Sequence, residues 1–198
     1  MSARARLPTL GLTGAPGAGK STIARELAAL GCVVADSDAL AREAYDDPEV
    51  RGALAARWGT VDRRAVADIV FRSPGDRAFL ESLVHPWIAR RRAELFAAAP
   101  PGTRALVIDA PLLLEAGLGA ACDRVIFVDC ALETRQSRVA SSRGWSPAEL
   151  ARREAAQWPL DRKRSLAHHV IRNDGDPASL RAQVRAVLDE VCPPGSPA

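Results

Sequence analysis

Residues 14–21 read Gly14-Ala15-Pro16-Gly17-Ala18-Gly19-Lys20-Ser21 and match the pattern G-x-x-x-x-G-K-[ST]. The apolar segment Leu10–Thr13 precedes the match, and a helical pattern over about residues 21–30 follows it. The glycines let the backbone curl so that its N–H groups point inward, and the start of the helix adds a partial positive charge. This stretch therefore predicts a P-loop that binds the phosphates of a nucleoside triphosphate, placed between a strand and a helix.

The polar residues of the loop have separate expected tasks. Lys20 is expected to reach the β- and γ-phosphates, and the Ser21 hydroxyl is expected to ligate Mg²⁺. Of the 27 basic residues only Lys20 and Lys163 are lysines. A chain that otherwise uses arginine nearly everywhere thus has the compact ammonium of Lys20 in the loop, where a planar guanidinium would not fit. The residues expected to bind the nucleotide here are Gly14, Ala15, Pro16, Gly17, Ala18, Gly19, Lys20, Ser21 and Thr22.

Short apolar segments alternate with helical patterns along the chain, which predicts βαβ units and a parallel sheet. After the strand at Leu10–Thr13, the predicted strands are Cys32–Ala35, Ala105–Ile108, Val125–Val128 and His169–Ile171. Strands this apolar are usually buried on both faces, as parallel strands are. The predicted fold class is therefore α/β.

Two regions interrupt the alternation. Residues of about 40–100 predict helices, with turn signals near Asp47-Pro48, Gly59 and Ser73-Pro74-Gly75. Residues of about 138–165 are rich in arginine, with helix starts at Ser146-Pro147 and Pro159, and they predict a mobile lid. We therefore expect a nucleotide-binding core at 1–40 and 104–192, with the lid inserted in it. The helical domain is expected at 41–103 and a disordered tail at 193–198.

Composition excludes several classes of protein. A net charge of +3 is too small to indicate a nucleic-acid-binding protein. No apolar run is long enough to span a membrane, and no signal peptide follows the basic N-terminus. The four cysteines lack the C-x-x-C spacing and are expected to be reduced thiols. We therefore expect a cytoplasmic protein without nucleic-acid or membrane partners, monomeric or weakly homo-oligomeric.

Four acidic residues follow predicted strands, where ligands of open α/β sheets bind. Asp38 is expected to orient an acceptor hydroxyl; the alternative is that Asp36 or Ser37 caps a helix and Asp38 complements its dipole. Asp109 is expected to contact Mg²⁺ or its waters, or else to hydrogen-bond at the strand end. Asp129 is expected to cap a helix.

Arginine and histidine give weaker signals. Arg138 and Arg143 lie in the predicted lid, where an arginine can stabilise the transferring phosphoryl group or simply be solvated. Residues 90–92, three arginines, predict an exposed helix face. His85-Pro86 is expected to end one helix and start another. His168-His169 have no third ligand at metal-site spacing.

Several motifs occur together over about residues 9–190. They are Gly11-Leu12-Thr13-Gly14, Asp36-Ser37-Asp38 with Ala41-Arg42, Val84-His85-Pro86, Asp109-Ala110-Pro111-Leu112-Leu113-Leu114-Glu115, Gln157-Trp158-Pro159-Leu160, Lys163-Arg164 and Asn173-Asp174-Gly175. In this order and spacing the chain resembles the dephospho-CoA kinase family. It departs from the usual pattern at His168 and Arg172, where the family has Asp, and in a shorter segment at 58–63.

The resemblance implies a three-layer α/β/α P-loop NTPase fold with a five-stranded parallel sheet, a helical acceptor-binding insertion and a lid. It implies ATP with Mg²⁺ as donor and the ribose 3′-hydroxyl of dephospho-CoA as acceptor. By motif position, Asp38 corresponds to the catalytic base, and Thr13 and Arg143 to residues near the transferring phosphate. The implied acceptor-side residues are Arg42, His85, Pro111 and Glu115, joined by Arg138 of the lid. Asn173 and Gly175 correspond to the stretch near adenine.

Two alternatives remain at this stage. One is a related P-loop kinase for another nucleotide or nucleoside, which the PLL-x-E and His-Pro elements disfavour. The other is a non-catalytic nucleotide-binding regulator. A GTPase would show N-K-x-D, and the segment Asn173–Asp176 lacks the lysine.

Overall fold

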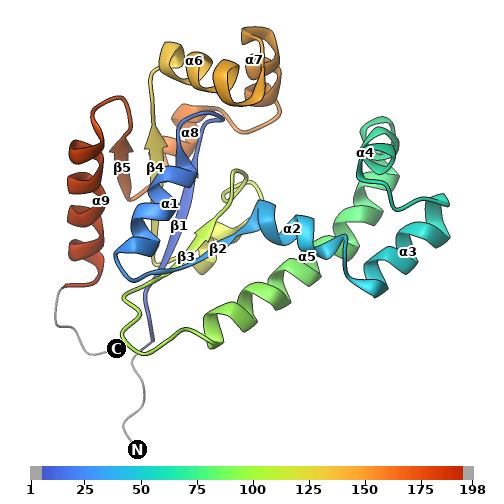
Figure 1. The fold of residues 1–198 in the computed structure, drawn as a ribbon, viewed down its shortest axis with the longest axis horizontal. Coiled ribbons are helices and arrows are strands. Elements are labelled where there is room, and N and C mark those ends of the chain that lie inside the picture. The colour runs from blue at the N-terminus through green and yellow to red at the C-terminus, as the bar shows by residue number, and fades with distance from the viewer. Residues whose placement is uncertain (1–5, 194–198) are drawn as a thin grey trace, which may run out of the picture. The chain divides into compact units, whose positions relative to one another are not determined.

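The computed structural model describes residues 6–193 and contains a five-stranded sheet with strand order β2-β3-β1-β4-β5 (Figure 1). The central strand β1 pairs in parallel with β3 and with β4, and β4 pairs in parallel with β5. The predicted fold class is confirmed. The strand bounds are β1 (Thr9–Gly14), β2 (Val33–Asp36), β3 (Leu106–Asp109), β4 (Arg124–Asp129) and β5 (His169–Arg172).

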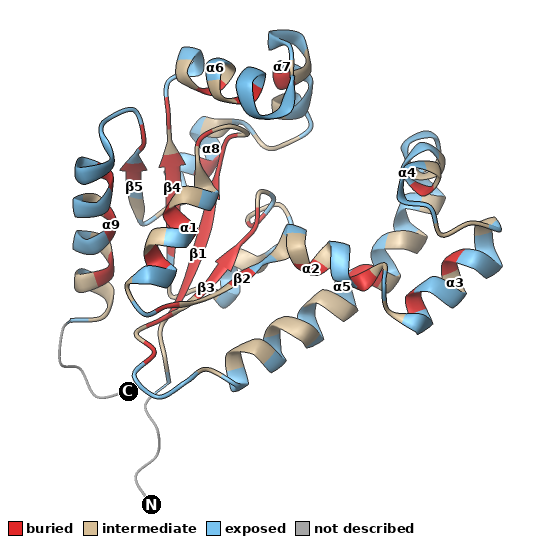
Figure 2. Ribbon diagram, viewed as in Figure 1, coloured by how far each residue is buried: buried red, intermediate tan, exposed pale blue. Residues whose placement is uncertain are grey.

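Apolar residues of the sheet pack against two helices, α1 (Lys20–Ala29) and α9 (Pro177–Val191). Figure 2 shows the buried stretches of β1, β3 and β4. The other face of β1 is approached closely, because a Cβ on Gly11 would lie 2.5 Å from Leu113 Cδ2. The 3₁₀ helix η1 (Leu118–Ala121) and α8 (Leu160–Ser165) also contact β1. The central strand is thus enclosed, which holds the residues at its carboxyl end in place.

The predicted lid begins within α6 (Leu132–Arg143) and continues through α7 (Pro147–Ala155) to α8. Arg135 is buried and pairs with Glu154, which ties α6 to α7. The expectation that Asp129 caps a helix is wrong. Asp129 is the last residue of β4 and forms an ion pair with Arg164 at 3.0 Å. The N–H of Ala131, at the N-cap of α6, donates instead to Asp174. The acid that serves this helix end comes from a distant part of the sequence.

Residues Asp36–Ala98 form a compact unit of their own, and the remainder of the chain forms the other. The helices of this unit are α2 (Ser37–Ala44), α3 (Pro48–Trp58), α4 (Arg63–Arg72) and α5 (Pro74–Ala97). The expectation that His85-Pro86 separates two helices is wrong, because α5 runs through Pro86. Proline removes one backbone bond from the helix. Packing of α5 against α2, α3 and α4 offsets that loss.

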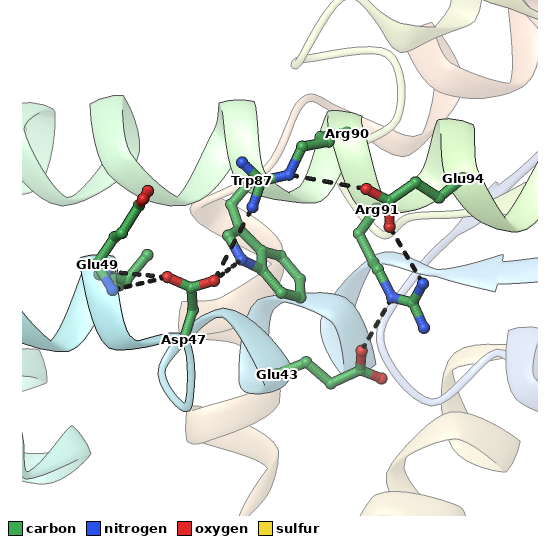
Figure 3. Close-up of polar contacts among 8 residues, drawn as sticks. Glu43, Asp47, Glu49, Trp87, Arg90, Arg91 and Glu94 are labelled. Atoms are coloured by element: carbon green, nitrogen blue, oxygen red, sulfur yellow. Dashed lines mark hydrogen bonds and ion pairs between the residues drawn. The ribbon is translucent and has the colours of Figure 1, made fainter.

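A polar cluster joins three of these helices (Figure 3). Asp47 caps α3 by accepting from the N–H groups of Glu49 and Val50, and its second oxygen accepts the indole N–H of Trp87 at 2.8 Å. Arg90 pairs with Asp47 at 3.9 Å. Arg90 and Arg91 are largely on the surface, as predicted, with side chains 59% and 42% exposed, yet they also form ion pairs. Arg91 likewise pairs with Glu43 of α2 at 3.8 Å.

Further expectations from the sequence concern the cysteines, membrane-spanning helices, domain boundaries and C-terminal tail. All four cysteines are free, as predicted. In the part of the chain that the structure describes, no helix has the length and apolar character needed to cross a membrane. The expected domain boundaries at 40/41 and 103/104 stay predictions. From residue 194 on, the predicted tail lies outside the described residues.

Candidate functional site

The loop between β1 and α1 has a backbone that only glycine adopts readily. Gly17 and Gly19 have φ of 78° and 91°, in the left-handed region. A Cβ on Gly14 would lie 2.6 Å from the carbonyl oxygen of Val128, and one on Gly17 would lie 2.8 Å from Val139. The glycines of the motif are therefore required by close approach as well as by backbone conformation.

Helix α1 begins without a side-chain cap, since Gly19 at its N-cap has no side chain. The positive end of its dipole therefore meets no capping side chain and suits an anion. Lys20 lies in this first turn, and its Nζ donates to the carbonyl oxygen of Gly14 at 3.4 Å. Ser21 is exposed beside it. The loop thus has the local geometry of a phosphate-binding site.

Asn173 supports the loop from the far end of the chain. Its side chain is buried, and Nδ2 donates to the carbonyl oxygen of Ala18 at 2.8 Å. The backbone carbonyl of Asn173 accepts from Arg138 at 2.9 Å. The place near adenine that the family resemblance implied for Asn173 stays a prediction, and the structure adds that its side chain holds the loop. Burial raises the pKa of the neighbouring Cys130 thiol to about 11, so it stays neutral beside Arg138.

A cavity of about 220 Å³ opens beside these groups. Gly19, Asn173 and Gly175 line it together with Arg138, so residues from three separate parts of the sequence meet here. Its further lining residues are Thr22, Glu26, Pro177 and Leu180. The mixed polar and apolar lining suits the base and sugar of a nucleotide whose phosphates occupy the loop.

Asp109 and Thr13 lie at the carboxyl ends of adjacent strands. Asp109 is 8% exposed and pairs in register with Leu12 of β1, one residue before Thr13. Thr13 is fully buried, and its hydroxyl donates to the carbonyl oxygen of Pro111 at 3.4 Å. The Asp109 carboxylate and the Thr13 hydroxyl therefore lie at the same edge of the sheet, where the loop begins.

Glu115 takes part in a buried ion pair that sequence reasoning missed. Its Oε1 lies 2.7 Å from Nζ of Lys163, whose side chain is completely buried, and accepts from the N–H of Trp158 at 3.0 Å. Its Oε2 is buried without a hydrogen-bond partner among residues 6–193. The signal in the sequence that could have pointed to this ion pair is the scarcity of lysine, which singles out Lys163 as it does Lys20.

Arg143 is exposed at the end of α6 and stacks on an aromatic ring. Its guanidinium carbon lies 4.7 Å from the ring centroid of Trp145, and that of Arg153 lies 4.1 Å from the same centroid. Arg153 also pairs with Glu149 at 2.6 Å. Arg143 is therefore held by a neighbouring side chain rather than freely solvated.

In the helical unit, Asp36 is the N-cap of α2, accepting from the N–H groups of Asp38 and Ala39. Of the two expected caps, the structure thus selects Asp36 over Ser37, and Asp38 is exposed in the first turn. Arg42 lies one turn further along α2 and is exposed. His85 is exposed on α5, which packs against α2. All three predicted residues are accessible to a ligand.

Comparison with known proteins identifies the family. The sequence profile of the dephospho-CoA kinase family matches residues 8–179. The dephospho-CoA kinase of Synechococcus sp. (strain CC9605) is 39% identical over 189 residues, which cover 90% of this chain and 91% of that protein.

Solved structures agree. The crystal structure of TT1252 from Thermus thermophilus is 35% identical, with a TM-score of 0.82, covering 93% of this chain and 98% of that one. Dephospho-CoA kinase from Campylobacter jejuni shares the fold, with 21% identity, a TM-score of 0.65 and coverage of 93% and 96%. The chain accordingly belongs to the dephospho-CoA kinase family.

Proposed function

We propose that this chain transfers the γ-phosphoryl group of ATP to the ribose 3′-hydroxyl of dephospho-CoA, giving coenzyme A and ADP. The observation that carries the proposal is family membership along nearly the whole chain, because relatives 39% identical over 90% of its length are dephospho-CoA kinases. The geometry of the loop supports it, since the N–H groups of Gly14–Ser21 and the Lys20 ammonium suit a triphosphate.

The transfer needs orientation and charge stabilisation more than covalent chemistry. In our proposal the loop amides and Lys20 bind the β- and γ-phosphates, and Asn173 keeps the loop in shape. Asp38 orients the acceptor hydroxyl and takes its proton. Arg143, with Thr13, stabilises charge on the transferring group. Arg42, His85, Pro111, Glu115 and Arg138 contact the acceptor, and closure of the lid excludes water.

The residues present also suit Mg²⁺. Magnesium bound with a nucleotide takes only one or two protein oxygens, the phosphates and water supplying the others. Asp109 provides a carboxylate at the end of β3, and Ser21 provides an exposed hydroxyl in the first turn of α1. Mg²⁺ would neutralise charge on the β- and γ-phosphates. We further propose a cytoplasmic enzyme, monomeric or weakly homo-oligomeric, without nucleic-acid or membrane partners.

The test is an assay with ATP, Mg²⁺ and dephospho-CoA that measures coenzyme A and ADP separately. We expect both products in equal amounts, and only when dephospho-CoA is present. ADP released at an equal rate without dephospho-CoA would contradict the proposal. Phosphorylation of another nucleotide or nucleoside, with dephospho-CoA unchanged, would favour a related kinase. Tight ATP binding without turnover of any acceptor would favour a nucleotide-binding regulator.

A further inference from the structure

The second lysine of the chain is buried in the last helix of the lid segment. Lys163, in α8, is 0% exposed, and its ammonium has three oxygen partners. These are Glu115 Oε1 at 2.7 Å, Gln157 Oε1 at 2.8 Å and the carbonyl oxygen of Pro111 at 2.9 Å. An ammonium has three N–H donors. This set of acceptors therefore uses all of them.

The partners of Lys163 belong to separate segments. The carbonyl of Pro111 also accepts from the Thr13 hydroxyl at 3.4 Å, and Thr13 directly precedes the first glycine of the phosphate-binding loop. Glu115 Oε1 also accepts from the backbone of Trp158, which lies between α7 and α8. One ammonium thus joins the end of β1, the loop after β3 and the end of the lid.

A buried ion pair is a weak source of stability, since apolar residues of similar volume often serve as well. What the charged group provides here is directionality. Glu115 and Gln157 fix two N–H groups of the ammonium, and the third N–H then determines where the Pro111 carbonyl lies. That carbonyl in turn determines the orientation of the Thr13 hydroxyl.

We propose that Lys163 is a positioning residue for phosphoryl transfer, which acts by fixing the Pro111 carbonyl and, through it, the Thr13 hydroxyl beside the phosphate-binding loop. The inference rests on the proposed function, because it concerns the geometry of that transfer. A displacement of about 1 Å in a positioned group can slow an enzyme by about 100-fold.

The decisive comparison is between Glu115→Gln and the double variant Lys163→Met/Glu115→Gln. Lys163→Met alone leaves the Glu115 carboxylate buried without its counter-ion and is prone to misfold, whereas in Glu115→Gln the amide oxygen still accepts from the ammonium, which keeps three acceptors. The double variant leaves no unpaired charge. If Lys163 only neutralises Glu115, the two proteins turn over at the same rate. If Lys163 positions Pro111, kcat of the double variant is about 10- to 100-fold lower, with the KM for ATP unchanged.

A double-mutant cycle with Thr13→Val identifies the route. Because Lys163 acts through Thr13, we expect Thr13→Val to slow the Lys163→Met/Glu115→Gln protein much less than it slows Glu115→Gln. The matched control is Arg104→Met/Asp189→Asn, which removes an ion pair of 2.7 Å outside the site. The control should lower the melting temperature and leave kcat unchanged.

Circular dichroism first shows that each protein is folded. The results then separate failure of the role of Lys163 from failure of the proposed function. Equal kcat for Glu115→Gln and the double variant, in an enzyme that makes coenzyme A, overturns the role of Lys163 alone. Failure of the wild-type protein to make coenzyme A overturns the proposed acceptor. In that case the comparison is made on the slow hydrolysis of ATP, where Thr13 still adjoins the phosphates. The same loss in the double variant supports the inference, and equal hydrolysis rates overturn it.

Discussion

Asn173 donates from Nδ2 to the carbonyl oxygen of Ala18 at 2.8 Å, a contact between residues 155 positions apart in the sequence. It connects the segment after β5 to the phosphate-binding loop. A Cβ on Gly19 would lie 2.1 Å from the same nitrogen, so the amide fills the space that the missing side chain leaves. The shape of the loop therefore depends on a residue outside the motif.

Asn173→Asp should weaken ATP binding by about tenfold, because a carboxylate of similar shape cannot donate to the Ala18 carbonyl and leaves it unsatisfied. Isothermal titration calorimetry with ATP measures this directly. The matched control is Gln183→Leu, which removes the hydrogen bonds between the Gln183 side chain and the backbone N–H and carbonyl of Arg172, the residue before Asn173. Equal ATP affinities for all three proteins would contradict the assigned role.

Gly19→Ala should abolish measurable ATP binding, since its Cβ collides with Asn173 and the φ of 91° is strained for alanine. Gly59 provides the control, with a φ of 67° and nothing within 4 Å of the point where a Cβ would lie. Gly59→Ala should carry the strain alone, lowering the free energy of unfolding by about 1 kcal/mol. If both variants bind ATP like wild type, the close approach at Gly19 is unimportant.

Asp38→Asn should lower kcat by about 100- to 10,000-fold, because an amide cannot accept the proton of the acceptor hydroxyl. The Kd for ATP should change little, since the phosphates are bound by other residues. Asp36→Asn serves as the control because an asparagine retains the capping oxygen used by α2. Normal turnover by Asp38→Asn at saturating substrates would show that the residue is misassigned.

Trp145→Leu should lower kcat about three- to tenfold by removing the ring on which Arg143 is stacked. Trp145→Phe keeps an aromatic face and should recover most of the loss. Phe79→Leu is the control, because it removes the ring that lies 5.0 Å from the guanidinium carbon of Arg57, for which no catalytic role is proposed. Equal effects of the two leucine variants would indicate a general effect on folding.

Trp87→Phe should make the helical unit less stable at neutral pH and alter its acid response. The Trp87 hydrogen bond is the largest cause that lowers the pKa of Asp47. A carboxyl with a lowered folded pKa adds stability above its unfolded pKa of about 3.9, and that stability is lost as pH falls through the folded pKa.

The difference in stability between wild type and Trp87→Phe should therefore be constant from about pH 7 to about pH 5 and shrink as the pH falls below about 3.9. Urea unfolding at several pH values measures it. In an Asp47→Asn background, Trp87→Phe should produce no such pH-dependent difference. A difference that stays constant with pH would mean that the indole contributes only packing.

The sequence alone determined those features that depend on local chemistry. The eight residues from Gly14 to Ser21 specify a phosphate-binding turn, because only glycine adopts its backbone angles and only an adjoining helix start supplies the dipole. Alternating apolar segments specified the five strands to within one or two residues. The helix start at Pro147 was equally readable, because proline suits a first helical position, and the turn signals at 47–48 and 73–75 lie where α3 and α5 begin.

Only tertiary structure decided which distant groups meet. Asp129 looks like a helix cap in sequence, yet Asp174 supplies the acceptor to the start of α6. Pro86 looks like a helix boundary, yet packing by neighbouring helices keeps α5 continuous. The scarcity of lysine singles out Lys163 in the sequence, yet only the fold shows that it is enclosed with Glu115. Each of these outcomes depends on long-range packing, and local propensities carry no information about partners far away in the sequence.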